Sequence, residues 1–316
     1  MTDNPLVSIL CLCYNQGKFI KESLESIKAQ TYKNFEIIIC DDFSHDESVE
    51  IIKSWISENK DLKIEFIEHH QNLGITKTLN ELLKISQGKY IQILALDDIL
   101  IEEKLDRHVA MLENSSDEYA LVFSDAHLIN HESKLYQNKF IARHFSYLSL
   151  ESQNFYEMLL TKNFIPAMSV LMKKKHIMAE NGWDESLPFE DYDMWLRLSK
   201  NHSFLFDDVI TCSYRLHDNN SHRKKNVINY NAFFNIFIKH TQNIRVRNIL
   251  FSYLEDIYRE KLLTNEHKIF YSHYPMKSFS ERFIKNNYNP KIYRVVLEIQ
   301  RFTKYFRILI NSIFSK

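Results

Sequence analysis

The first 125 residues alternate between short apolar runs and longer stretches in which apolar residues recur at helical spacing. Residues 6–12 and 90–96 are almost continuously apolar, which is typical of strands buried on both faces of a sheet. The pattern predicts strands over residues 6–12, 35–40, 64–68, 90–96 and 120–124, and helices over residues 19–29, 49–56, 76–86 and 102–114.

This alternation of strands and helices predicts an α/β fold with a mostly parallel central sheet and helices on both faces. Ligands bind such sheets beyond the carboxyl ends of the strands. Asp41 and Asp42 lie at the end of the second predicted strand, and Asp97 and Asp98 lie at the end of the fourth. These two acidic pairs are therefore the first candidates for a functional site.

The pattern beyond residue 125 is less regular. It predicts helices over residues 152–162 and 192–199, and strands over residues 168–172, 203–206 and 211–215. Helical stretches rich in aromatic residues follow, over residues 230–240, 245–263 and 292–314. We therefore expect two domains, one over residues 1–225 and a helical C-terminal region over residues 226–316.

Composition and charge exclude several classes of protein. The 40 Lys and Arg residues balance 41 Asp and Glu residues, so the net charge of −1 gives no indication of a nucleic-acid partner. With only four glycines, the chain has neither a G-x-G-x-x-G dinucleotide loop nor a P-loop. Neither a secretory signal nor a membrane-spanning run is expected, which predicts a cytoplasmic protein.

The four cysteines have no C-x-x-C spacing. Cys11 and Cys13 are two residues apart and would share one face of a strand, so a zinc site is conceivable there. Reduced thiols in the core of a cytosolic protein are the favoured interpretation for all four cysteines.

Asp97 and Asp98 are candidate ligands of a divalent cation. Two adjacent carboxylates that leave a buried strand repel each other unless a cation relieves them, and Mg²⁺ or Mn²⁺ suits such oxygen ligands. The alternative is a solvated turn, in which aspartate is common.

Three other polar segments carry candidate chemistry. A carboxylate of Asp41 or Asp42 can accept hydrogen bonds from N–H groups of a ligand, or it can cap the N-terminus of a helix. Glu190, Asp191 and Asp193 begin a predicted helix, where acidic residues are ordinary, and one of them is a candidate proton acceptor. His217 follows a short strand and is either a metal or phosphate contact or an exposed loop residue.

These segments together resemble the family 2 glycosyltransferases. The similarity covers about residues 5 to 221 and lies in motifs that follow the order and spacing of the family, over residues 7–15, 24–44, 72–74, 96–98, 182–185, 190–197 and 214–217. The resemblance implies a GT-A fold that binds a nucleoside diphosphate sugar. It also implies transfer of the sugar, with inversion, to a hydroxyl of a glycan or lipid-linked acceptor in cell-envelope polysaccharide synthesis.

The resemblance assigns roles to individual positions. On the side of the sugar donor it places Tyr14 and Asn15 at the nucleotide. It implies that Asp42 accepts a hydrogen bond from the imide N–H of the base, and this contact favours uracil. Lys77 is the cation nearest to the diphosphate, and Asp97 belongs to the same donor site. The family's acidic motif lacks its first carboxylate here, because Ala95 stands in that position.

The catalytic and metal positions follow in the same way. The metal set is Asp97, Asp98 and His217, with Mn²⁺ or Mg²⁺ as the cofactor. Asp191 matches the general base of the family, and Glu190 beside it shapes the acceptor site. Two alternatives remain at this stage: a non-catalytic protein that binds a nucleotide sugar or a partner on the same fold, and a nucleotidyltransferase.

The last 35 residues carry a further expectation. Basic residues and helically spaced apolar residues between Arg282 and Lys316 predict a basic amphipathic helix. Such a helix either lies on the inner face of the cytoplasmic membrane or packs against the domain or in a homodimer interface.

Overall fold

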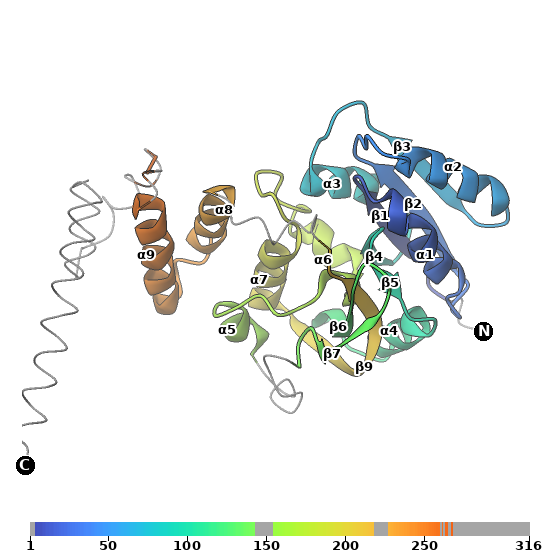
Figure 1. Ribbon diagram of the computed structural model, residues 1–316. Coiled ribbons are helices and arrows are strands. Elements are labelled where there is room, and N and C mark those ends of the chain that lie inside the picture. Colours follow the sequence, from blue (N-terminus) through green and yellow to red (C-terminus); the bar gives the residue numbers. More distant parts are fainter. Residues whose placement is uncertain are drawn as a thin grey trace, which may run out of the picture. The chain divides into compact units, whose positions relative to one another are not determined.

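The computed structural model describes residues 4–142, 154–217 and 227–259, together with residues 261, 263, 264 and 267. The chain divides into two compact units, Met1–Arg223 and Lys224–Lys316. Figure 1 shows the elements of both units.

The first unit is built on one mixed sheet of nine strands in the order β3-β2-β1-β4-β8-β6-β9-β5, with β7 paired to β6. Strands β3, β2, β1 and β4 are parallel, as are β6 and β9, whereas β8 runs antiparallel to both β4 and β6. The strands are β1 Val7–Cys13, β2 Phe35–Asp41, β3 Ile64–Glu68, β4 Tyr90–Ala95, β5 Ile99–Leu100, β6 Tyr119–Ile129, β7 Leu135–Lys139, β8 Leu171–Lys173 and β9 Ser203–Arg215.

Helices flank this sheet in chain order. They are α1 Gly17–Lys28, α2 Ser48–Glu58, α3 Ile75–Ile85, α4 Lys104–Glu113, α5 Phe155–Leu159, the short 3₁₀ helix η2 Ala167–Ser169, α6 Lys174–Ala179 and α7 Asp191–Asn201. Helices α1 and α2 pack against each other, and α3 contacts β1 and β2. The predicted α/β fold is confirmed.

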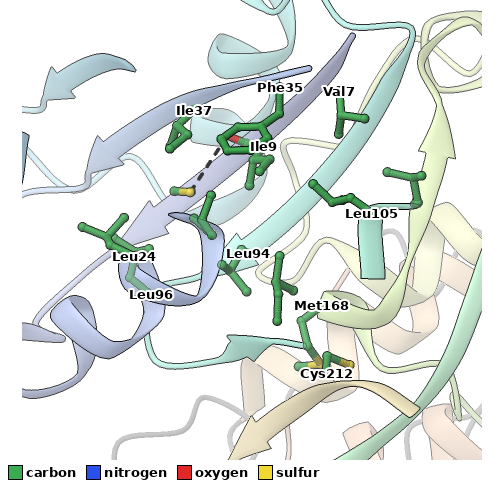
Figure 2. Close-up of a cluster of buried hydrophobic side chains, with 14 of the residues drawn as sticks. Val7, Ile9, Leu24, Phe35, Ile37, Leu94, Leu96, Leu105, Met168 and Cys212 are labelled. Atoms are coloured by element: carbon green, nitrogen blue, oxygen red, sulfur yellow. Dashed lines mark hydrogen bonds between the residues drawn. The ribbon is translucent and has the colours of Figure 1, made fainter. Parts of the chain in front are cut away.

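The main core lies between the sheet and the helices α1, α2 and α4. Alternate residues of β1, including Val7 and Ile9, point into this core, where Leu24 of α1 and Leu105 of α4 meet them (Figure 2). Met168 and Cys212 belong to the same cluster and lie farther along the sheet. All four cysteines are free and buried, so their thiols are part of the interior.

The structure differs from the expected elements at several places. Residues 203–215 form the single strand β9 rather than two short strands, and its pairing with β6 shifts register between Asp207 and Cys212. Asp207 is buried and accepts two hydrogen bonds from Arg107. Residues 168–172 divide between η2 and β8. The strands β5 and β7 were not predicted, since β5 has two residues and β7 is mostly exposed.

The described part of the second unit consists of α8 Val227–Ile238 and α9 Ile244–Arg259, which pack against each other. A helical C-terminal region is therefore present. Within the described residues, no helix combines the length and the apolar character needed to cross a bilayer. The amphipathic helix expected between residues 282 and 316 lies outside the described residues, so its predicted membrane or dimer contact stays a prediction.

Gly88 provides a test of the packing between β1 and the segment that enters β4. A Cβ atom at this position would lie 2.5 Å from the backbone nitrogen of Ser8. We expect Gly88→Ala to lower the free energy of unfolding by about 1–3 kcal/mol through overpacking. Gln87→Ala, at the exposed neighbouring residue, is the control. Equal urea midpoints for both variants would contradict the close approach.

Candidate active site

The carboxyl ends of β1, β2 and β4 meet at one edge of the sheet. Cys13 pairs with Asp41 in the parallel register of β1 and β2, and Leu12 pairs with Ala95 in that of β1 and β4. Tyr14, Asp42 and the pair Asp97–Asp98 therefore leave the sheet side by side. The expectation that both acidic pairs lie at such ends is fulfilled by this register.

Strand β9 fixes the Asp97–Asp98 turn from the other side. The backbone N–H of Arg215 donates to Oδ1 of Asp98 at 2.9 Å, and its Nε donates to the carbonyl of Asp97 at 2.7 Å. Both aspartates are buried. Burial, followed by the negative charge of Asp97, raises the pKa of Asp98 well above its ordinary value. Burial and the neighbouring charge thus disfavour the ionised form of Asp98, which a bound cation would favour.

Arg215 is itself almost fully buried and joins this turn to two other segments. Its guanidinium donates to Oε2 of Glu22 on α1 at 2.7 Å, and to the carbonyl of Asn130 and the hydroxyl of Ser133 at 3.1 and 2.9 Å. It also lies over the ring of Phe19, 4.8 Å from the centroid. Arg215 thus holds α1, the β6–β7 turn and the acidic turn together.

His217 reaches the same turn from the end of β9. Its Nε2 lies 2.9 Å from Oδ2 of Asp97, and its ring packs on Phe19 with centroids 5.0 Å apart. The structure therefore brings His217 to Asp97, in line with the predicted metal set.

The predicted metal ligands Asp97, Asp98 and His217 are of chemical types that suit a hard divalent cation. Across the described parts of the chain, no group of three His, Cys, Asp or Glu side chains is arranged as a metal site. Oδ1 of Asp98 is directed at the backbone of Arg215 rather than at His217. The predicted set is thus assembled in part, as an Asp97–His217 contact with Asp98 adjacent in sequence.

The second acidic pair begins helix α7. Glu190 is the N-cap residue of α7 and Asp191 its first residue, and both are half-buried. Oδ1 of Asp191 accepts from the backbone N–H of Tyr192 and Oδ2 accepts from the amide of Asn163, both at 2.7 Å. Asp193, the third acid, is buried and bound to Arg197, so it holds the helix rather than facing a ligand.

The two members of this pair differ in their surroundings. Burial and the negative charge of Asp191 raise the pKa of Glu190. Burial also raises the pKa of Asp191, but the N–H groups of Tyr192 and Asn163 favour its ionised form and oppose that effect. Both pKa values are thus raised by burial, and only that of Asp191 is opposed by hydrogen bonds from neighbouring N–H groups.

Tyr214 on β9 connects the two acidic pairs. Burial raises the pKa of its phenol, and so do four carboxylates, those of Asp98, Asp97, Asp191 and Glu190. Both pairs therefore act on one side chain, although 92 positions of sequence separate Asp98 from Glu190. Carboxylates of the strand-end pair and of the helix-start pair thus lie within electrostatic range of the same phenol.

The nucleotide side of the predicted site is a set of loops at the ends of β1 and β2. Tyr14 is 48% exposed. Asn15 adopts a left-handed backbone with φ of 53°, its N–H donates to the hydroxyl of Ser44, and its Oδ1 accepts from the N–H of His45. The side chain of Asn15 therefore ties the two loops together and leaves the Tyr14 ring exposed.

Asp42 is largely engaged by its own protein. Its carboxylate accepts from the backbone N–H groups of Leu73 and Gly74 at 2.8 and 2.9 Å, and Nδ1 of His69 lies 2.8 Å from Oδ1. Asp42 thus holds the loop that leads into α3. Lys77, in the first turn of that helix, is exposed.

Two residues of this site were not predicted. Arg215 lay in a recognised polar cluster, but arginine at the end of a strand gives no sign that it will be buried. Asn163 stands in a loop, and asparagine is common in loops. The motif over residues 214–217 thus marked the position of Arg215 but not its contacts, and Asn163 had no signal, since each residue acts through a residue far away in the chain.

A central mixed α/β sheet with acidic pairs at its ligand-binding edge is the architecture of GT-A glycosyltransferases. Residues 8–177 match the family model for Glycosyl transferase family 2. The chain is 33% identical over 218 residues to an uncharacterized glycosyltransferase of Methanocaldococcus jannaschii, which covers 68% of this chain and 72% of that protein. The chain belongs to glycosyltransferase family 2.

Another relative has a named reaction. The chain is 28% identical over 215 residues to the Escherichia coli enzyme UDP-Glc:alpha-D-GlcNAc-diphosphoundecaprenol beta-1,3-glucosyltransferase WfgD, with coverage of 67% of this chain and 76% of that one. Three Rickettsia relatives are longer, and the chain spans only 34% to 37% of their length.

Solved structures share the fold. S. aureus TarS 1-349 in complex with UDP-GlcNAc has a TM-score of 0.61 at 16% identity, covering 84% of this chain and 78% of that one. Mannosyltransferase PcManGT from Pyrobaculum calidifontis, in complex with GDP-Man and Mn²⁺, has a TM-score of 0.58 at 16% identity, covering 77% and 66%. Both likenesses support the GT-A fold.

The role of Arg215 can be tested by Arg215→Lys. A lysine keeps the charge but cannot reach all four groups that accept hydrogen bonds from the arginine side chain. We therefore expect the free energy of unfolding to fall by about 2–4 kcal/mol. Urea denaturation checks this value. Lys53→Ala, which removes an exposed ion pair with Glu68, is the control and should change little. An unchanged midpoint for Arg215→Lys would show that the buried contacts are not stabilising.

Proposed function

We propose that this enzyme transfers a sugar, with inversion at the anomeric carbon, from a nucleoside diphosphate sugar to an acceptor hydroxyl. The observation that carries the proposal is the Asp97–Asp98 turn at the carboxyl end of β4, held by Arg215 and His217, together with the hydrogen-bonded carboxylate of Asp191 at the start of α7. The turn serves the leaving diphosphate, and Asp191 serves the incoming hydroxyl. Inversion requires these two tasks to fall to groups on opposite faces of the sugar.

Asp191 is the general base in this proposal. A base must be ionised when the acceptor hydroxyl arrives, and the two N–H donors on Asp191 favour that state. Glu190 is the less suitable base, because the charge of Asp191 favours its protonated form. A protonated Glu190 can donate a hydrogen bond to an acceptor hydroxyl and thereby position it.

The donor lies over the edge formed by β1, β2 and β4. Tyr14 contacts the base, Asn15 and Asp42 hold the loops around the nucleotide, and Lys77 contributes positive charge near the diphosphate. Asp97, Asp98 and His217 would hold Mn²⁺ or Mg²⁺, which neutralises the charge that develops on the diphosphate as it leaves. The PcManGT complex with Mn²⁺ supports this use of a metal on the same fold.

A UDP-sugar donor and a lipid-linked acceptor are the preferred substrates. The name of WfgD gives UDP-Glc as donor and a sugar on diphosphoundecaprenol as acceptor, and TarS is solved with UDP-GlcNAc. A lipid-linked acceptor would bring the enzyme to the inner face of the cytoplasmic membrane, in cell-envelope polysaccharide synthesis. A panel of nucleotide sugars, with and without Mn²⁺, identifies the donor by thermal stabilisation.

The base is tested with Asp191→Asn. We expect turnover to fall by roughly 10²–10⁴-fold, the usual contribution of general base catalysis, while donor affinity stays within a factor of about two. Release of nucleoside diphosphate and isothermal titration calorimetry measure the two quantities. Asp208→Asn, an exposed acid on β9, is the matched control. Near-normal turnover of Asp191→Asn would remove the assignment.

The metal site is tested with Asp98→Asn, which keeps the shape of the side chain and removes its charge. We expect Mn²⁺-dependent donor affinity to fall at least about tenfold, because one of the carboxylate ligands is lost. Donor affinity without Mn²⁺ should change less. If calorimetry gives the same affinity as the wild type in the presence of Mn²⁺, Asp98 is not a ligand.

A further inference from the structure

Asn163 lies in the segment between α5 and η2, close to the start of α7. The next two residues, Phe164 and Ile165, are 1% exposed, and the ring of Phe164 packs against Phe123 on β6. The hydroxyl of Tyr192 donates to the carbonyl of Leu159 at 2.6 Å and ties α7 to α5. The segment that carries Asn163 is thus fixed from both sides.

The amide of Asn163 is directed at the carboxylate of Asp191. Its Nδ2 donates to Oδ2 at 2.7 Å, while Oδ1 of Asp191 accepts from the helix backbone. Each carboxylate oxygen therefore has one donor and keeps lone-pair capacity for a further one. Of these two donors, the amide is the one that a side-chain substitution can remove.

We propose that Asn163 is the positioning residue of the active site: its amide holds the Asp191 carboxylate ionised and aimed for the acceptor hydroxyl. This inference rests on the proposed function, because it takes Asp191 as the base. Asn163 acts through Asp191 and has no assigned contact with the reacting atoms.

The charges around Asp191 explain why such a residue is needed. Glu190 precedes it on the same helix, and the phenol of Tyr214 is affected by both carboxylates. Burial raises the pKa of Asp191, and the amide of Asn163 is one of the groups that lower it. Without that amide, the carboxyl group would hold its proton to a higher pH and be unavailable as a base.

The test measures the protonation of Asp191 directly and needs no substrate. Carbon-13 NMR of protein labelled at aspartate carboxyls follows the titration, and Asp191→Asn identifies the Asp191 signal. We expect Asn163→Ala to raise the pKa of Asp191 by about one unit, and Asn163→Asp to raise it further, because a second carboxylate then faces the first. If Asn163→Asp fails to fold, Asn163→Ala alone still tests whether the amide lowers the pKa of Asp191.

Asn154→Ala is the matched control. Asn154 caps the N-terminus of α5, the helix that precedes the segment of Asn163, and its Oδ1 accepts from the N–H of Glu157, so its loss perturbs that helix without removing a hydrogen bond to Asp191. We expect this variant to leave the Asp191 titration in place. In turnover assays with an identified sugar donor, the acid limb of the pH profile should move to higher pH in the Asn163 variants, by the same amount as the pKa of Asp191.

The outcomes separate this inference from the proposed function. An Asp191 titration that stays unchanged in Asn163→Ala, while Asp191→Asn is inactive, overturns the role of Asn163 and leaves the base in place. An active Asp191→Asn overturns the base, and with it any catalytic role for Asn163. A shifted titration together with an inactive Asp191→Asn supports both.

Discussion

The buried contact between Arg215 and the Asp97–Asp98 turn is the constraint on which the rest of the site depends. Two adjacent carboxylates in the interior are unfavourable unless donors or positive charge compensate them. Arg215 supplies both, through its backbone N–H to Asp98 and its Nε to the carbonyl of Asp97. The turn lies at the carboxyl end of β4, where the proposed cation would bind.

The same contact joins the two parts of the sheet. The parallel strands β3, β2, β1 and β4 carry the loops proposed to bind the nucleotide, whereas β9, beside β6, carries Tyr214 and Arg215, and His217 follows its end. Because β5 follows the acidic turn and pairs with β9, the turn is held on both sides. The residues proposed to bind the sugar donor and the proposed base therefore come from separate parts of the chain.

The acidic pair at the start of α7 shows how neighbours in sequence acquire different chemistry. Glu190 and Asp191 are both half-buried, but only Asp191 accepts hydrogen bonds from the backbone N–H of Tyr192 and the amide of Asn163. Hydrogen bonds to the ionised form favour charge, and a neighbouring charge disfavours it. Hydrogen bonds thus oppose the effect of burial on Asp191, which is the property that the proposed general base requires.

The sequence by itself determined the α/β class, the strands β1, β2 and β4 and the acidic residues at their ends, because parallel strands buried on both faces are recognisable as continuous apolar runs. It also carried the motifs by which the family was recognised. Only the tertiary structure decided that β9 is one strand, that Arg215 is buried against Asp98 across 117 positions, and that Asn163 meets Asp191. Such contacts depend on how distant segments pack, and local patterns of hydrophobicity and charge contain no record of that packing.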